Sequence, residues 1–173
     1  DGVKAKLGMV PNMMRAMASS PAVLDAYQQF SGALSKGSLS PKIREQIALA
    51  VGQMSGCDYC VAAHSAIGKM SGLTPEQIRD SRLGTAVDKR TEAALRLALR
   101  IVETRGEVSD LDISSARDGG LDDGAIAEVA ANTALNLFTN YFNHIADTEI
   151  DFPRAEPLEG HGVCATEGCA RRN

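Results

Sequence analysis

The stretch PKIREQIALAVGQMSGCDYCVAAH, residues 41–64, decides the expected fold. In its first half apolar residues recur at helical spacing, and small apolar residues fill much of the opposite side. A helix of this kind is buried on two sides, so other helices must pack around it. Glu45 falls among the small residues, where an ionised carboxylate is costly without a partner. We expect either a raised pKa or a hydrogen-bond partner for Glu45; the alternative is a side chain that reaches the surface or pairs with Arg44 or Lys42.

The remaining sequence also has helical patterns. Ser-Pro or Thr-Pro pairs, which place a capping hydroxyl before the first helical residue, predict helix starts near residues 21, 41 and 75. Apolar spacing predicts further helices over 91–103 and about 122–137, and the pattern resumes over 138–146. Residues 106–120 read as a mixed connection, and no stretch alternates like a strand. With no Trp and 4% aromatic residues, the core must consist of small and aliphatic side chains. The expected fold class is all-α, a compact multi-helix bundle.

We expect one domain over residues 1–153, followed by an irregular, glycine-containing tail over 154–173. A weak internal echo relates residues 44–74 to residues 91–122, since both read as helix, helix and then Gly-Leu before another helix. Either a helix-pair duplication or a chance likeness between amphipathic helices explains the echo. The second copy has no Cys or His where the first has them.

Composition excludes several classes of function. The net charge of −4 and the lack of a basic run argue against nucleic acid as a partner. No apolar stretch reaches the roughly 18 residues that a membrane span needs, so no membrane partner is expected. The residues present show no secretory signal pattern, and a cytoplasmic location is the expectation.

The second half of the opening stretch carries the chemistry. Gly56 ends one helix and Cys57 begins the next, so Cys57, Cys60 and His64 share one face at spacings of three and four residues. The first turn of a helix favours a thiolate, because the helix dipole and free N–H groups point there. His64, one turn further, is suited to exchange a proton with the sulfur. The pattern predicts a redox-active pair with an acid–base partner.

Other interpretations of these residues remain open. Cys57, Cys60 and His64 supply three of the four ligands of a structural zinc site, or the cysteines are inert core residues. A c-type haem is excluded because Val61, not His, follows Cys60. No GxGxxG or P-loop pattern occurs, so we expect no bound nucleotide and no other cofactor.

The spacing Glu45-x11-Cys57-x2-Cys60-x3-His64 resembles the alkyl hydroperoxidase D-like signature of the carboxymuconolactone decarboxylase superfamily. The run YFNHIADTEIDFP, residues 141–153, resembles the peroxidase-related branch. The resemblance implies an all-helical fold that forms trimers or hexamers.

The resemblance also assigns roles. It implies that Cys60 is the peroxidatic cysteine, that Cys57 resolves the sulfenic acid, and that Glu45 and His64 form a proton relay. The implied activity is thiol-dependent reduction of hydroperoxides, with electrons from an external dithiol or thiol protein. The best-known peroxidases of the family carry His before the second cysteine, where this chain has Tyr59, so the resemblance predicts a weaker relay.

Alternative functions are a non-catalytic redox sensor or interaction module, and a lactone decarboxylase-like enzyme, against which the cysteines argue. Tyr59 and His144 are candidate pocket residues; the alternative for His144 is a histidine that caps a helix C-terminus. Cys164 and Cys169 are expected to be exposed thiols, although a metal or a disulfide there is the alternative.

Overall fold

The computed structural model describes residues 8–158, and it folds them into helices and connections without a strand. The helices are α2 (Asn12–Met17), α3 (Pro21–Leu34), α4 (Pro41–Met54), α5 (Asp58–Met70), α6 (Pro75–Arg82), α7 (Lys89–Thr104), α8 (Asp110–Asp118) and α9 (Asp123–Ala146). The predicted all-α class is confirmed. The predicted tail lies mostly outside the described residues, as do Cys164 and Cys169.

The helix starts follow the capping signals of the sequence. Proline occupies the first position of α3, α4 and α6, each after a Ser or Thr. The hydroxyl of Ser40 accepts from the N–H of Ile43, and Thr74 and Gln77 form a reciprocal capping box. These side chains satisfy N–H groups that the first turn of a helix leaves free. The three predicted starts are therefore confirmed.

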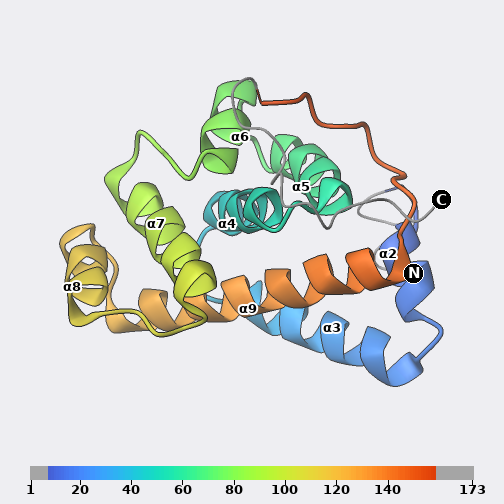
Figure 1. The fold of residues 1–173 in the computed structure, drawn as a ribbon, viewed down its shortest axis with the longest axis horizontal. Helices are drawn as coiled ribbons and strands as arrows, with labels where there is room; N and C mark the ends of the chain where they lie inside the picture. Colours follow the sequence, from blue (N-terminus) through green and yellow to red (C-terminus); the bar gives the residue numbers. More distant parts are fainter. Residues whose placement is uncertain (1–7, 159–173) are drawn as a thin grey trace, which may run out of the picture.

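Helix α4 lies at the centre of the bundle and packs against α5, α6, α7 and α9 (Figure 1). Its residues 46–52 are all buried, and five of these seven are Ala, Gly, Val or Leu. Burial on two sides was the expectation for this helix, and the structure confirms it. The main core cluster joins α4 to α7 and α9 through aliphatic side chains, including Ile47, Leu95 and Val129.

Two glycines let α5 approach α4 closely. A Cβ atom at Gly52 would lie 3.4 Å from the Cβ of Cys60, and one at Gly68 would lie 3.0 Å from a methyl of Leu73 and 3.9 Å from the Cβ of Glu45. A side chain larger than that of Ala at Gly52 would push α5 away from α4, and any side chain at Gly68 would require Leu73 to move. The backbone approach that follows brings Glu45 of α4 across the face of α5.

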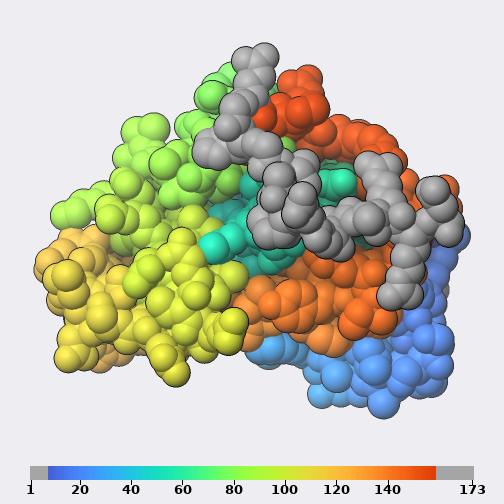
Figure 2. Space-filling model, viewed as in Figure 1, coloured from blue at the N-terminus to red at the C-terminus, as the bar shows by residue number. Residues whose placement is uncertain are grey.

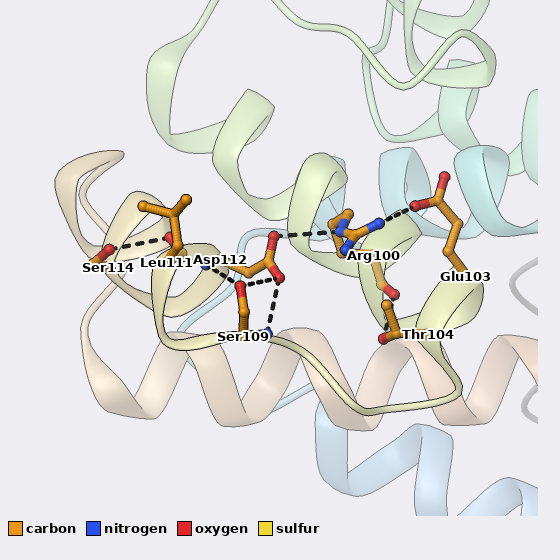
Figure 3. A network of polar contacts seen from close by, with 7 residues as sticks. All are labelled: Arg100, Glu103, Thr104, Ser109, Leu111, Asp112 and Ser114. Carbon is orange, nitrogen blue, oxygen red and sulfur yellow. Dashed lines mark hydrogen bonds and ion pairs between the residues drawn. The ribbon is translucent and has the colours of Figure 1, made fainter.

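The expectation of a mixed connection over residues 106–120 was wrong, because the segment contains helix α8. Ser109 and Asp112 form a capping box at its start, and Asp112 also accepts from Arg100 of α7 at 3.3 Å (Figure 3). Arg100 donates in addition to Glu103 at 2.7 Å. The helix is polar and contributes one buried residue, Ala116, so its sequence has little of the apolar spacing that marks the other helices.

The segment after α9 runs back over the bundle. Asp151 accepts from the N–H of Asn12 at the start of α2 at 2.7 Å, and the carbonyl of Glu156 accepts from Arg82 of α6 at 2.7 Å. In the space-filling view this segment follows the edge of the molecule from the α2 end toward α6 (Figure 2). It thereby closes over the start of α5.

The internal echo has a structural counterpart. Gly72 and Gly120 both have positive φ, and the following Leu73 and Leu121 donate their N–H groups to Gly68 and Ala116. This is the bonding of a Schellman motif, which ends α5 and α8 in the same way. The two helix pairs share this ending and differ in length, since α5 has 13 residues and α8 has 9.

The connection between α3 and α4 is held by a single carboxylate. Glu128 of α9 accepts from the N–H groups of Ser38 at 2.7 Å and Leu39 at 2.9 Å. Burial alone would raise the pKa of Glu128, but the N–H donors of Ser38 and Leu39, with the Ser38 hydroxyl and the charge of Arg44, outweigh it, and the pKa lies below its usual value. The ionised form therefore binds the loop.

This clamp predicts a stability change in acid. Because the folded-state pKa is depressed, the stabilisation is present above the unfolded value near 4.3 and is lost as pH falls through the lower folded value. Glu128→Gln keeps one acceptor and loses the charge, so it should lower the free energy of unfolding by roughly 1 kcal/mol near neutral pH. Urea titrations from pH 6 to pH 3 should show the difference from wild type shrinking. A difference that stays constant with pH would contradict an ionised clamp.

Candidate functional site

Cys57 and Cys60 lie at the start of α5, and the structure joins them in a disulfide with Cα atoms 5.3 Å apart. Gly56 has φ +64°, and the N–H of Cys57 donates to the carbonyl of Gly52, so the chain reverses sharply after α4. Cys57 is the N-cap residue, and its sulfur accepts from the N–H of Cys60 at 3.3 Å. Both sulfurs therefore meet the positive end of the helix dipole.

The side chain of Glu45 is hydrogen-bonded to that of His64. The Nδ1 atom of His64 lies 2.7 Å from the Oε2 atom of Glu45, and the two side chains are 24% and 18% exposed. Arg44, an alternative partner, donates to the carbonyl of Leu39 instead. The carboxylate fixes one ring nitrogen of His64 and leaves Nε2 free to accept or donate a proton. The predicted partner for Glu45 is present, on the face of α5 one turn beyond Cys60.

Tyr59, between the cysteines, is buried and anchors other segments. Its hydroxyl accepts from the N–H of Met13 at 3.2 Å, and its ring meets Phe152 edge-on at 5.9 Å. Burial, with the nearby carboxylate of Asp151, raises the pKa of Tyr59 above its ordinary value. Tyr59 thus stays a neutral phenol at physiological pH and holds the N-terminal helix and the segment after α9 over the cysteine pair.

Two further residues, which the spacing of the sequence did not indicate, lie near the site. Asn143, in the last part of α9, donates from Nδ2 to the sulfur of Cys60 at 3.3 Å, across 83 residues of sequence. Tyr27 of α3 has a raised pKa because its phenol is buried and Glu45 is near. The candidate pocket residue His144 is exposed at the end of α9 and sits beside Asn143 in sequence.

The cysteines are enclosed, while the relay pair reaches solvent. Cys57 is 1% exposed and Cys60 3%, and Met13, Ile150 and Phe152 pack over them. Within residues 8–158 no group of three or more His, Cys, Asp or Glu side chains is placed to hold a metal ion. In that same range no helix is long and apolar enough to cross a membrane.

A cleft of about 510 Å³ lies elsewhere, between α7 and α8. Its walls alternate cationic and anionic side chains, among them Arg96, Arg100, Glu92 and Glu103. These charges neutralise each other, and the lining contains neither sulfur nor imidazole. The cysteine pair with its relay, not this cleft, is the candidate active site.

Comparison with known proteins agrees with the geometry. The family model described as the carboxymuconolactone decarboxylase family matches residues 21–104, which include all four residues of the pair and the relay. A solved structure described as the alkylhydroperoxidase AhpD core, an uncharacterized peroxidase-related protein from Ralstonia eutropha JMP134, superposes with a TM-score of 0.79 at 28% identity over 87% of this chain and 82% of that one. The chain is an alkyl hydroperoxidase D-like member of the carboxymuconolactone decarboxylase superfamily.

Other solved structures similar to this alkyl hydroperoxidase D-like chain carry different descriptions. An uncharacterized peroxidase-related protein from Silicibacter sp. TM1040 has a TM-score of 0.78 at 26% identity, over 84% of this chain and 79% of that one. The debrominase Bmp8 has a TM-score of 0.75 at 20% identity, over 87% and 82% of the two chains, a likeness that concerns the fold. No curated protein sequence matches the chain.

The approach of α4 to α5 gives a prediction for Gly52. Gly52→Ala places its Cβ at an ordinary contact distance from Cys60 and gains helix propensity, so stability should stay level or rise by up to about 1 kcal/mol. Gly52→Leu overpacks the same contact and should cost about 1–3 kcal/mol. Thermal unfolding of the two variants checks the ordering. Equal melting temperatures for the two variants would show that the helices are not in close contact here.

Proposed function

We propose that the chain is a thiol-dependent peroxidase and disulfide oxidoreductase, which reduces hydroperoxides through Cys57 and Cys60. One observation carries the proposal: a cysteine pair at a helix start lies one turn from a histidine that a carboxylate orients. These are the parts that thiol chemistry needs, a stabilised thiolate, a second sulfur and a proton carrier. The family to which the chain belongs supports the same conclusion.

In the proposed reaction the Cys60 thiolate attacks one oxygen of the O–O bond. Two electrons pass from sulfur to the peroxide, the product being Cys60 sulfenic acid and an alkoxide, which takes a proton to become an alcohol. The thiol of Cys57 then condenses with the sulfenic acid, which forms the disulfide and releases water. An external dithiol returns two electrons and two protons by exchange and leaves as its own disulfide.

The relay pair suits the proton steps of this scheme. His64 stands on the same face of α5 as Cys60, and its partial exposure gives protons a route to solvent that the enclosed sulfurs lack. Glu45 stabilises the imidazolium that forms when His64 takes a proton. Tyr59, a neutral and buried anchor, adds no second acid–base group between the cysteines. Glu45 and His64 would then act without the extra histidine of the best-known peroxidases.

The alternatives differ from the proposal in measurable ways. A redox sensor would form the same disulfide without multiple turnovers. A lactone decarboxylase-like enzyme would not need the cysteines. Debromination, the activity named for Bmp8, is not proposed, because the likeness to that protein lies at 19–20% identity.

We also propose that the chain self-associates. Phe138, Tyr141 and Ile145 line one exposed stripe of α9, and Phe30 on the adjoining α3 is 41% exposed. We call these four residues the apolar patch. No residue of helix α3 is fully buried, although eight of its 14 positions are Ala, Val, Leu, Tyr or Phe. A second copy that covered the apolar patch would remove this surface from water.

The catalytic proposal predicts distinct failures for the two cysteines. Cys60→Ser should abolish sulfenic acid formation and peroxide turnover. Cys57→Ser should still form a sulfenic acid on Cys60 but fail to close the internal disulfide. Peroxide consumption with a dithiol donor, together with dimedone trapping, measures both. Dimedone on Cys57 of the Cys60→Ser protein, with none on Cys60 of the Cys57→Ser protein, would reverse the assignment.

The relay predicts a separate kinetic effect. His64→Gln and Glu45→Gln should each slow peroxide attack by about 10- to 1000-fold, because the variants cannot carry the proton. The rate of sulfenic acid formation in stopped flow checks this. Wild type without peroxide turnover, but with a reversible disulfide, would favour the sensor.

Self-association predicts a mass above that of one chain. Light scattering at micromolar concentration should give a multiple of 18.3 kDa, with a trimer or hexamer as the family expectation. Ile145→Asp, in the apolar patch, should shift the mass toward one chain. Val87→Asp is the matched control, since Val87 is fully exposed outside the patch. A wild-type mass near 18.3 kDa would rule out the assembly.

A further inference from the structure

Helix α9 turns an amide-bearing face toward the bundle. Asn132, Asn136, Asn140 and Asn143, spaced by four, four and three residues, are all buried. The spacing places them in one stripe along the helix. A buried amide must find partners, since an unsatisfied polar group costs about 1–3 kcal/mol.

The amides of this stripe differ in their hydrogen bonds, and that of Asn140 has no partner among the described residues. Asn132 donates from Nδ2 to the carbonyl of Glu128, and Asn136 donates to the carbonyl of Asn132, each four residues back along α9. Asn143 does not make this bond to its own helix. Its Nδ2 donates to the sulfur of Cys60 at 3.3 Å, and its Oδ1 has no hydrogen-bond partner among the described residues. No competing bond therefore draws the amide from the sulfur.

We propose that Asn143 is a further catalytic residue, whose amide stabilises the thiolate of Cys60 and thereby selects Cys60 over Cys57 as the attacking sulfur. The proposal rests on the proposed dithiol chemistry of the pair. A disulfide sulfur is a weak acceptor, whereas a thiolate is a charged one, and hydrogen bonds to charged groups are about twice as strong. The donor is already in place before reduction, so the bond strengthens when the charge appears.

The surroundings of Cys60 increase the effect. Both Asn143 and Cys60 are buried, at 4% and 3% exposure, so little water competes for the thiolate. Met13, Ile150 and Phe152, which pack on the cluster that the two cysteines form with Tyr59 and Ala63, are apolar. Of the nearby charged groups, Asp58 is exposed in the same turn, and the Glu45–His64 pair lies one turn further. The Cys57 sulfur has a different donor, the backbone N–H of Cys60.

The amide also favours the reduced pair over the disulfide. Exchange with a dithiol consumes the protein disulfide and the dithiol, and it yields two protein thiols and the disulfide of the donor. Stabilisation of the Cys60 thiolate pulls this equilibrium toward the reduced protein. Loss of the amide should make the protein disulfide harder to reduce.

The test measures the Cys60 thiolate without any peroxide. In a background with Cys57→Ser, Cys164→Ser and Cys169→Ser, which leaves Cys60 as the one thiol of the sequence, ultraviolet absorbance against pH gives the midpoint of thiolate formation. Asn143→Leu should raise this midpoint by about one pH unit, which is tenfold in thiolate stability. Asn143→Asp keeps the side-chain shape, replaces the donor by a negative charge, and should raise the midpoint at least as much. Asn143→Asp is the variant to measure if Asn143→Leu does not fold.

Two controls separate a direct contact from a general disturbance. Asn136→Leu removes another buried amide of the same stripe, two turns away, and should leave the midpoint unchanged. In the matched background with Cys60→Ser, Cys164→Ser and Cys169→Ser, Asn143→Leu should leave the midpoint of Cys57 unchanged. With both cysteines present, Asn143→Leu should require about tenfold more reduced dithiol for half-reduction.

An unchanged Cys60 midpoint in the folded Asn143 variants would overturn the proposal, as would equal shifts from Asn136→Leu and Asn143→Leu. Because no peroxide enters the measurement, the outcome is independent of turnover. An Asn143-dependent midpoint in a protein that does not consume peroxide would refute the peroxidase function and retain the role of Asn143.

Discussion

The close contact between α4 and α5 is the constraint on which the site depends. Gly52 and Gly68 let the backbones approach, and without that approach Glu45 would not reach His64. The same helix α4 is also enclosed by α6, α7 and α9, so it cannot shift without disturbing the core. Dense interiors respond to a change of one methylene, and the Glu45–His64 pair is therefore held by packing as well as by its own hydrogen bond.

The sequence predicted those features that depend on residues close together in the chain. Proline at the first position marks the starts of α3, α4 and α6, with a hydroxyl cap at the last two, and the turn at Gly56 sets the start of α5. Helical spacing placed the cysteines near His64, and burial on two sides predicted a partner for Glu45. Helix α8 was missed because capping and charge, not an apolar face, define it. Asn143 was missed because its contact with Cys60 joins segments 83 residues apart, a distance that spacing cannot bridge.

Helix α9 is built against the usual division of polar and apolar faces. Its C-terminal half buries Asn136, Asn140 and Asn143 and exposes Phe138, Tyr141 and Ile145. Burial of amides is costly, and Asn140 has no hydrogen-bond partner among the described residues. An arrangement that works against stability in this way is expected at functional surfaces, which agrees with the roles proposed above for the inner face at the thiol site and for the outer face in assembly.

Tyr59 links the cysteine pair to α2 and to the segment after α9. The phenol accepts the Met13 amide and packs on Phe152, so the start of α5 holds both the N-terminal helix and the segment after α9. A shift of the first turn of α5 on reduction would loosen both attachments together. Amide hydrogen exchange at Met13 would then report the oxidation state of a cysteine pair 44 to 47 residues away along the chain. The mobility of α2 and of the segment after α9 would thus depend on the redox state of two buried sulfurs.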